Sequence, residues 1–258
     1  QACIVSPFLI SGAMAPVSPA GVMTQCLAEA MTGIAYGQMI RPGSPVIFGT
    51  FAASMSMASG APTFGTPEPA IGSMVVGQLA RRLNLPLRCS GNFTTSKLPD
   101  AQAMNEGTMS MLAAIHCGAN FILHSAGFLD GLLSMSYEKF MMDIDQLGMM
   151  QRLSEGVDLS ENGQAMDAIR EVGPGQHYLG CAHTQANFQE AFYRSSIADN
   201  NSFEQWQAEG QKPAHQRANE LAGKWLDAYE APYVDPGILD GLTDFVARKK
   251  ESMPDAFT

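Results

Sequence analysis

The chain has 258 residues, 46% of them hydrophobic, which is enough to bury the core of one large domain. Its 15 Lys and Arg are outnumbered by 25 Asp and Glu, giving a net charge of −10. Nucleic acids and anionic membrane surfaces repel such a chain, so this balance argues against both as partners and mildly favours cationic or neutral ligands.

The cysteines are spread along the chain without a CxxC pair, so we predict neither a disulfide framework nor a structural zinc site. The default location is then a reducing cytoplasm. No apolar run reaches the length of a membrane span, and the first residues lack the basic segment of a secretory signal. The chain starts without Met and close to an apparent strand, and we expect that further sequence precedes it.

Two strand–turn–helix units are predicted in the first 84 residues. An apolar strand over 7–11 precedes a helix over 18–40, and a strand over 46–48 precedes a helix over 67–84. Pro19 and Pro67 suit the first turn of their helices. The segment between residues 51 and 66, AASMSMASGAPTFGT, is predicted as a loop, and loops of this length are more often functional than idle.

Two more units follow. A strand over 87–89 leads through a polar turn to a helix over 100–117, and a strand over 120–124 leads to a helix over 136–155. The glycines at the four strand ends stand at positions 12, 49, 91 and 127, so they are separated by 37, 42 and 36 residues. This is the spacing of successive β/α units, and the sheet should be parallel.

After Gly156 the regular alternation of strands and helices is no longer predicted. We expect a helix over 160–172, the turn GPGQHYLGCAHT, and helices over 213–229 and 236–250. The fold class is therefore α/β with a C-terminal helical extension. Four units are half of an eight-unit barrel, whereas a doubly wound sheet would close with fewer units, and composition does not separate the two.

Polar and aromatic groups stand at every predicted strand end, where parallel α/β proteins bind ligands. His124 directly follows the apolar run FIL, so it is either a catalytic or ligand-orienting group or a structural histidine. Asp100 is a site candidate or a helix cap. Glu68, at a helix start, either complements the helix dipole or positions a cation beside the ring of Phe64.

The turn GPGQHYLGCAHT places two histidines six residues apart with one cysteine between them. Metal sites need more ligands than this turn supplies, so we predict no metal site and a loop that folds over the mouth of the sheet. The sequence contains no GxSxG elbow, no Walker A loop and no GxGxxG after a strand, which weakens the hydrolase, nucleotide-phosphate and Rossmann hypotheses.

Six strings, in this order, resemble one family: PGSPVIFG, SGAPTFGTPEPA, TTSKLPDAQAMNEG, GANFILHSAGFLDG, EVGPGQHYLGCAHT and FEQWQAEGQ. They are similar to the trimethylamine methyltransferase family, which includes pyrrolysine-containing trimethylamine:corrinoid methyltransferases and betaine-demethylating relatives. The resemblance implies a (β/α)8 TIM barrel, of which this chain is the C-terminal half. Residues 1–156 would be that half-barrel, and residues 157–258 a helical extension packed on the same domain.

The resemblance also implies an activity. A methyl group would pass from a quaternary or tertiary methylamine to the Co(I) of a corrinoid (cobalamin), which a cognate corrinoid protein carries. Trimethylamine-specific members contain pyrrolysine, and this sequence has only ordinary residues, so a betaine-like donor such as glycine betaine, carnitine or proline betaine is expected. We also expect a homo-oligomer. The alternatives are a quaternary-ammonium-binding protein without catalysis and an inactive barrel fragment.

The resemblance and the strand-end pattern together assign roles to individual residues. The expected catalytic residues are His124, Lys97 and Asp100. The corrinoid is expected to contact His177, Tyr178 and His183. A quaternary ammonium has no proton to donate, so aromatic faces and negative charge should bind it. The expected substrate-binding residues are Phe51, Phe64, Glu68, Asn92, Phe93 and Phe128.

Overall fold

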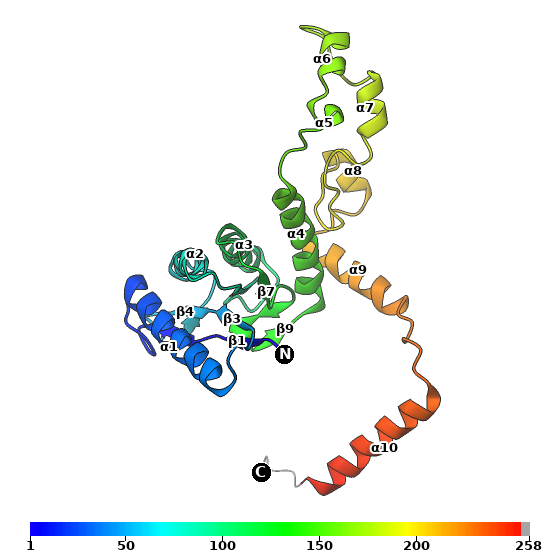
Figure 1. Cartoon of the computed structure of the whole chain (residues 1–258). Coiled ribbons are helices and arrows are strands. Elements are labelled where there is room, and N and C mark those ends of the chain that lie inside the picture. The colour runs from blue at the N-terminus through cyan, green and yellow to red at the C-terminus, as the bar shows by residue number, and fades with distance from the viewer. Residues whose placement is uncertain (254–258) are drawn as a thin grey trace. The chain divides into compact units, whose positions relative to one another are not determined.

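The computed structural model describes residues 1–253, and its central element is a four-stranded parallel sheet (Figure 1). The strands are β1 (Cys3–Val5), β3 (Val46–Gly49), β6 (Leu87–Ser90) and β7 (Phe121–Leu123), in that spatial order. Between successive strands lie the helices α1 (Pro19–Ile40), α2 (Pro67–Arg82) and α3 (Ala101–His116). The predicted α/β fold with a parallel sheet is confirmed.

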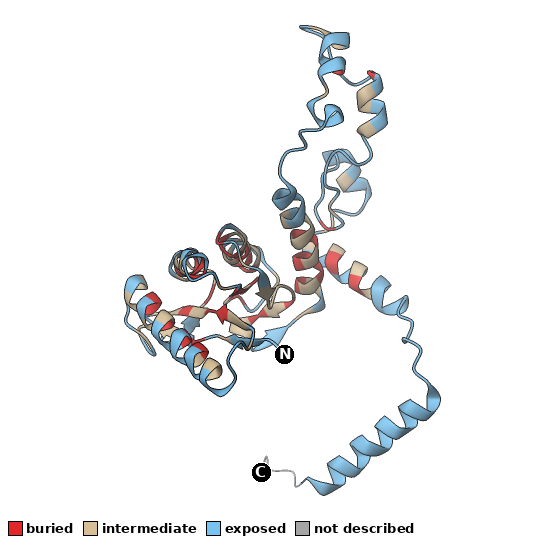
Figure 2. Cartoon of the chain, in the orientation of Figure 1, coloured by how far each residue is buried: buried red, intermediate tan, exposed pale blue. Residues whose placement is uncertain are grey.

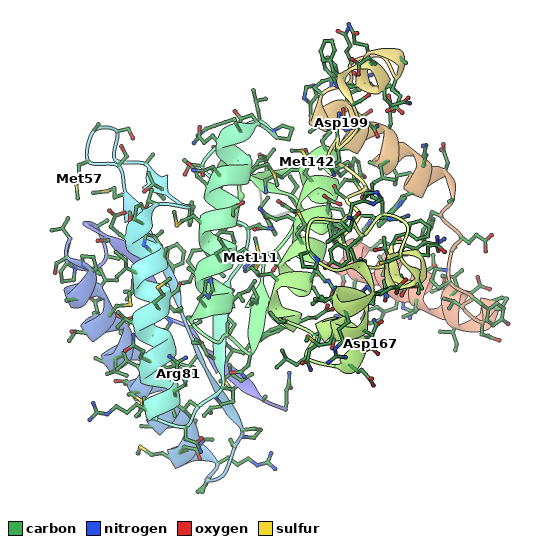
Figure 3. All side chains as sticks on the ribbon, turned by 90° about the horizontal axis from the view of Figure 1, so that it is seen from above. Met57, Arg81, Met111, Met142, Asp167 and Asp199 are labelled. Carbon is green, nitrogen blue, oxygen red and sulfur yellow. The ribbon has the colours of Figure 1, made fainter. Side chains whose placement is uncertain are left out.

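The three helices share one hydrophobic core with the sheet, and buried residues face inward on each of them (Figure 2). The helices α2 and α3 lie side by side in Figure 3. The buried Met111 belongs to α3, and Arg81, near the end of α2, donates to the Cys117 carbonyl at 2.6 Å. Repeated right-handed crossovers in one direction place successive helices on one face of a sheet. Within residues 1–253 the strand order follows the sequence, without the reversal of a doubly wound sheet.

Local capping explains where the helices begin. The N-cap side chains of Ser18, Asp100 and Ser136 accept hydrogen bonds from the backbone N–H groups three residues later, at 3.3, 3.0 and 3.0 Å. Pro19 and Pro67 occupy first-turn positions, where a missing N–H costs nothing. The predicted helix starts near residues 18, 67, 100 and 136 are confirmed.

The first two strands differ from the prediction because residues 3–11 and residues 46–55 are each divided between two sheets. The predicted strand over 7–11 is β2 (Phe8–Ser11), which pairs in parallel with β4 (Phe51–Met55), and β4 pairs antiparallel with β5 (Pro62–Thr63). The segment over 51–66 is thus a hairpin, and its prediction as a loop was wrong. Ala52 and Ala53 at its centre have a low propensity for strands, and the segment is extended where it pairs with β2.

A short hairpin of β8 (Phe128–Leu129) and β9 (Ser134–Met135), with the 3-10 turn η1 (Asp130–Leu132), leads into α4 (Tyr137–Glu155), which packs on α3. The helix predicted over 160–172 is broken where Ala165 adopts a left-handed conformation, φ 50°. The later elements of this part are α5 (Glu161–Gln164), α6 (Met166–Val172), α7 (Ala182–Asn187), α8 (Phe203–Ala208) and α9 (Ala214–Asp227).

Residues 1–222 form one compact unit, and a second unit begins at Gly223. The second unit contains α10 (Pro236–Ser252), whose start is capped by Asp235 and none of whose residues is buried (Figure 2). None of the helices within residues 1–253 combines the length and apolar character needed to cross a membrane.

Candidate active site

Six rings gather at the carboxyl ends of the strands, and we call them the aromatic cluster. Phe51 lies 5.3 Å from Phe93 and 6.1 Å from Phe64 between ring centroids, and Phe93 lies 5.5 Å from His124. The members of the cluster are Phe8, Phe51, Phe64, Phe93, His124 and Phe128. The sequence assigned all of them to the site except Phe8, which β2 places directly opposite Phe51.

The members of the cluster differ in depth. Phe64 and Phe93 are buried together with Ala53, so they form the floor of the cluster. His124, Phe51 and Phe128 are half-buried, and Phe8 is 50% exposed. The ring surfaces within reach of a ligand are therefore the half-buried and exposed ones, and the floor fixes their spacing.

Arg88 contacts the cluster through His124, and sequence reasoning missed it. It stands inside the short strand β6, and its side chain is only 5% exposed. One terminal nitrogen donates to the Thr50 carbonyl at 3.0 Å, and Nη2 lies 3.2 Å from Nδ1 of His124. No carboxylate within residues 1–253 pairs with Arg88, and its buried Nε has no hydrogen-bond partner there.

The contact with Arg88 defines the proton position on His124. A guanidinium can only donate, so Nδ1 must accept and the proton of the neutral ring lies on Nε2. Burial, followed by the positive charge of Arg88, lowers the pKa of His124 and favours this neutral form. Nε2–H has no partner among the described residues. His124 is thus a hydrogen-bond donor at the edge of the cluster, in a left-handed conformation of φ 57°.

Asn92 supports the segment that carries His124. The side chain is fully buried, and Nδ2 donates to the Ser125 carbonyl at 2.8 Å. Gly91 approaches the same segment so closely that an added Cβ would lie 2.8 Å from the Cα of Ser125. Asn92 and Gly91 therefore both lie against the backbone of the segment that carries His124. Asn92 was predicted to bind substrate, and its visible contact is with the backbone.

Lys97 and Asp100 both serve the turn between β6 and α3. The Lys97 ammonium donates to the Thr95 carbonyl at 2.8 Å and pairs with Asp130 at 3.2 Å on an exposed surface. Asp100 accepts from Ala103 N–H and from Ser96, and these hydrogen bonds hold the pKa of its carboxyl below the usual range. For Asp100 the structure has the capping geometry that the sequence left as an alternative to a site role.

Glu106 was not predicted and holds two strand-end loops together. Its carboxylate accepts from the Thr94 hydroxyl at 2.7 Å and from Thr95 N–H at 2.6 Å. The Thr95 hydroxyl in turn accepts from Phe64 N–H at 3.0 Å. The position of Glu106 six residues into a helix gives no sequence signal for this role, because its carboxylate bonds the turn before α3, and Thr95 of that turn links it to Phe64 after β5.

Glu68 is exposed in the first turn of α2 and lines a small cavity together with Ser11 and Ser54. His183 lies in α7, where its Nε2 is 2.9 Å from the Asn162 carbonyl, whereas His177 and Tyr178 stand on the exposed turn before that helix. No hydrogen bond or ring contact joins His177, Tyr178 and His183 to one another within residues 1–253, and their contact with a corrinoid stays a prediction. Residues 1–253 hold no group of three His, Cys, Asp or Glu side chains arranged for a metal ion.

These features define a class: an α/β protein with an aromatic cluster, a neutral histidine and a buried arginine at the carboxyl ends of its parallel strands. Comparison with known proteins identifies the family within this class. The model of the family described as trimethylamine methyltransferase (MTTB) matches residues 1–254, and the chain belongs to this family.

Its relatives fall under two descriptions. A glycine betaine methyltransferase from Desulfitobacterium hafniense (strain Y51) is 38% identical over 249 residues, covering 96% of this chain and 52% of the relative. The trimethylamine methyltransferase MttB2 of Methanosarcina mazei is 31% identical over 239 residues, covering 92% and 48%. MttB of Methanosarcina thermophila is 31% identical over 235 residues, covering 90% and 48%. The chain spans about half the length of the curated relatives it matches.

Proposed function

We propose that this protein takes part in transferring a methyl group from a betaine, a quaternary amine that also carries a carboxylate, to the Co(I) of a corrinoid on a partner protein. The observation that carries the proposal is Arg88, a buried cation without a carboxylate partner in residues 1–253, hydrogen-bonded to His124 at the edge of the aromatic cluster. A buried charge without a counter-ion is costly, so the site favours a ligand that supplies an anion.

Each part of a betaine has a complementary group in the site. The trimethylammonium end would lie against the accessible rings of Phe8, Phe51 and Phe128, where a desolvated cation over an aromatic face gains about 0.5–2 kcal/mol. The carboxylate would accept from Nε2–H of His124, within the field of Arg88. Trimethylamine lacks an anionic end and would leave this second half of the site unused.

The similarity to a protein named glycine betaine methyltransferase supports the same choice of donor. In the reaction, the electron pair of Co(I) would form the new bond to the methyl carbon while the C–N bond breaks and its electrons remain on nitrogen, leaving a tertiary amine. The protein residues would orient the donor and exclude water. Orientation of this kind is worth up to about 7–11 kcal/mol of the barrier.

We propose further that the sheet is part of a (β/α)8 barrel. The strand order follows the sequence, α1, α2 and α3 share one core on one face, and β1 and β7 have no neighbour on their outer edges within residues 1–253. The chain also covers only about half of its relatives. In such barrels the active site lies at the carboxyl ends of the strands, which is where the aromatic cluster is.

The residues proposed to contact the corrinoid are now fewer. His177 and Tyr178 are exposed and stay in the proposal, whereas His183 directs Nε2 at the Asn162 carbonyl. Replacing His177 and Tyr178 by Ala should leave betaine binding unchanged and raise the concentration of corrinoid protein needed for half-maximal transfer. An unchanged requirement for corrinoid protein would remove these two residues from the proposal.

The test of the activity uses the intact protein with reduced cobalamin or its corrinoid protein and three donors: glycine betaine, choline and trimethylamine. We expect methylcobalamin absorbance to grow with glycine betaine and to grow little with the two donors that lack a carboxylate. No transfer from any N-methylated donor in the presence of Co(I) would refute the methyltransferase proposal. Betaine binding measured by calorimetry without transfer would instead identify a binding protein.

A further inference from the structure

A fully buried ion pair lies on α4, next to the segment that carries His124. Lys139 Nζ is 2.5 and 2.6 Å from the two carboxylate oxygens of Asp143, and both side chains are 0% exposed. Such pairs seldom raise stability, because the cost of removing two charges from water roughly cancels their attraction. Its position therefore calls for a role other than stability.

Among residues 1–253, the side chains of this pair form one hydrogen bond to another residue, and it leads to the site. Asp143 Oδ2 accepts from the backbone N–H of Gly127 at 2.8 Å. Gly127 belongs to residues 124–128, the His124 loop, which begins with His124 and ends with Phe128. Gly127 has φ +88° and lies against the ring of Phe140, so the backbone there is held closely to α4.

A second buried side chain holds the same loop from the opposite element. Asn92, also 0% exposed, donates to the Ser125 carbonyl at 2.8 Å from the turn after β6. The two anchors flank Ala126 and fix one carbonyl and one N–H of a five-residue loop. They act on a loop whose first residue, His124, has a left-handed backbone, a conformation that surrounding contacts must maintain.

We propose that Asp143 and Asn92 are positioning residues that hold the His124 loop so that Nε2–H of His124 meets the carboxylate of the donor. This inference rests on the proposed function and adds to it the residues that determine carboxylate recognition. Asp143 reaches the ligand only through the loop backbone. Burial raises the pKa of Asp143, and the ammonium of Lys139 opposes this shift, so it favours the ionised carboxylate, which forms a stronger hydrogen bond with Gly127 than a neutral one would.

Two double variants separate the hydrogen bond to Gly127 from the burial of charge. Lys139→Met with Asp143→Asn removes both charges and retains a side-chain oxygen that can accept from Gly127. Lys139→Met with Asp143→Leu removes both charges and the acceptor. Calorimetry on the intact protein compares glycine betaine, which has a carboxylate, with choline, which has none, and thermal unfolding reports the stability of each variant.

The expected result is a loss of about tenfold in glycine betaine affinity for the Leu variant, with choline affinity within about twofold of wild type. The Asn variant should bind both ligands nearly as the wild type does. Equal losses for both ligands, or full betaine affinity in the Leu variant, would overturn the positioning role. If the wild-type protein fails to bind glycine betaine, the proposed function fails instead, so the two failures are distinguishable.

Hydrogen exchange of the unmodified protein gives a test that needs no variant to fold. An N–H bonded to a fully buried carboxylate exchanges slowly, so the Gly127 amide should be protected to the level of the α4 core. Exchange of Gly127 as fast as that of an exposed loop amide, such as Gly175, would contradict the anchoring of the His124 loop.

Discussion

Arg88 and His124 show how two side chains separated by 36 positions become one chemical unit. The strands β6 and β7 are neighbours with Arg88 opposite Phe121 and Ser90 opposite Leu123, so His124 follows just beyond the end of β6, where the long side chain of Arg88 reaches it. An arginine within the short strand LRCS was a visible signal, because a charge within a buried strand is rarely neutral to function. Its partner, however, follows from the register and could not be assigned from the sequence.

Replacing Arg88 by Met should separate binding from stability. The buried charge is lost without leaving a carboxylate unpaired, so the free energy of unfolding should be unchanged or higher, whereas glycine betaine affinity should fall by about tenfold or more. Calorimetry and thermal unfolding measure the two quantities. Arg88→Lys is the matched control: it keeps the charge but lacks the fork that spans Thr50 and His124, so it should recover only part of the affinity.

The pKa of His124 leads to a pH prediction with a definite sign. Its pKa in the folded protein is lowered from 6.5 by burial and then by Arg88, so below pH 6.5 the unfolded chain binds a proton that the folded state resists. His124 therefore lowers the free energy of unfolding as the pH falls from 6.5 to the pKa that its ring has in the folded protein. The unfolding temperature of His124→Phe should depend less on pH between about pH 7 and 5 than that of the wild type.

A nitrogen NMR titration tests the cause. The ring of His124 should titrate below pH 6.5 in the wild type and closer to 6.5 in Arg88→Met, because the neighbouring charge is then absent. At neutral pH the wild-type spectrum should have the chemical shifts of the Nε2–H tautomer. A ring protonated on Nδ1 would contradict the hydrogen bond from Arg88.

Among the elements, α2 and α3 approach closely because a glycine allows it. A Cβ added at Gly77 would lie 2.3 Å from the carbonyl oxygen of Cys117, which cannot move without disturbing the end of α3. Gly77→Ala should therefore lower the free energy of unfolding by about 1–3 kcal/mol. Gly37→Ala, in α1 with open space around it, is the control and should raise it by about 0.5–1 kcal/mol. Chemical denaturation of both variants measures the difference, and a similar stability for the two would contradict this packing.

The elements also separate what local sequence encodes from what pairing creates. Ser18, Asp100 and Ser136 cap their helices with their own side chains, so those boundaries were predictable. The strand β4 has the sequence FAASM, whose alanines favour strands weakly, and its extended conformation is held by pairing with β2. Propensity alone could not place it.

For the molecule as a whole, the open edges of the sheet give the clearest test of a barrel. Cys3 N–H donates to Pro45 O at the β3 side, so the alternation along a strand turns Ile4 N–H toward the outer edge. If the intact protein closes the barrel, the Ile4 amide should exchange slowly with solvent. Rapid exchange at Ile4 beside slow exchange at Cys3 would indicate that β1 remains an edge strand.

The sequence by itself determined the α/β class, the parallel sheet, most helix starts and five of the six rings in the aromatic cluster. These follow from short-range patterns: strand-end glycines at regular spacing, capping residues, and aromatic side chains just after apolar runs. Tertiary structure alone decided the tautomer of His124, the position of Asn92 beneath its loop, and the links from Glu106 and Asp143 to strand-end backbone. Those depend on which strands become neighbours and in which register, which is a long-range property that no local pattern encodes.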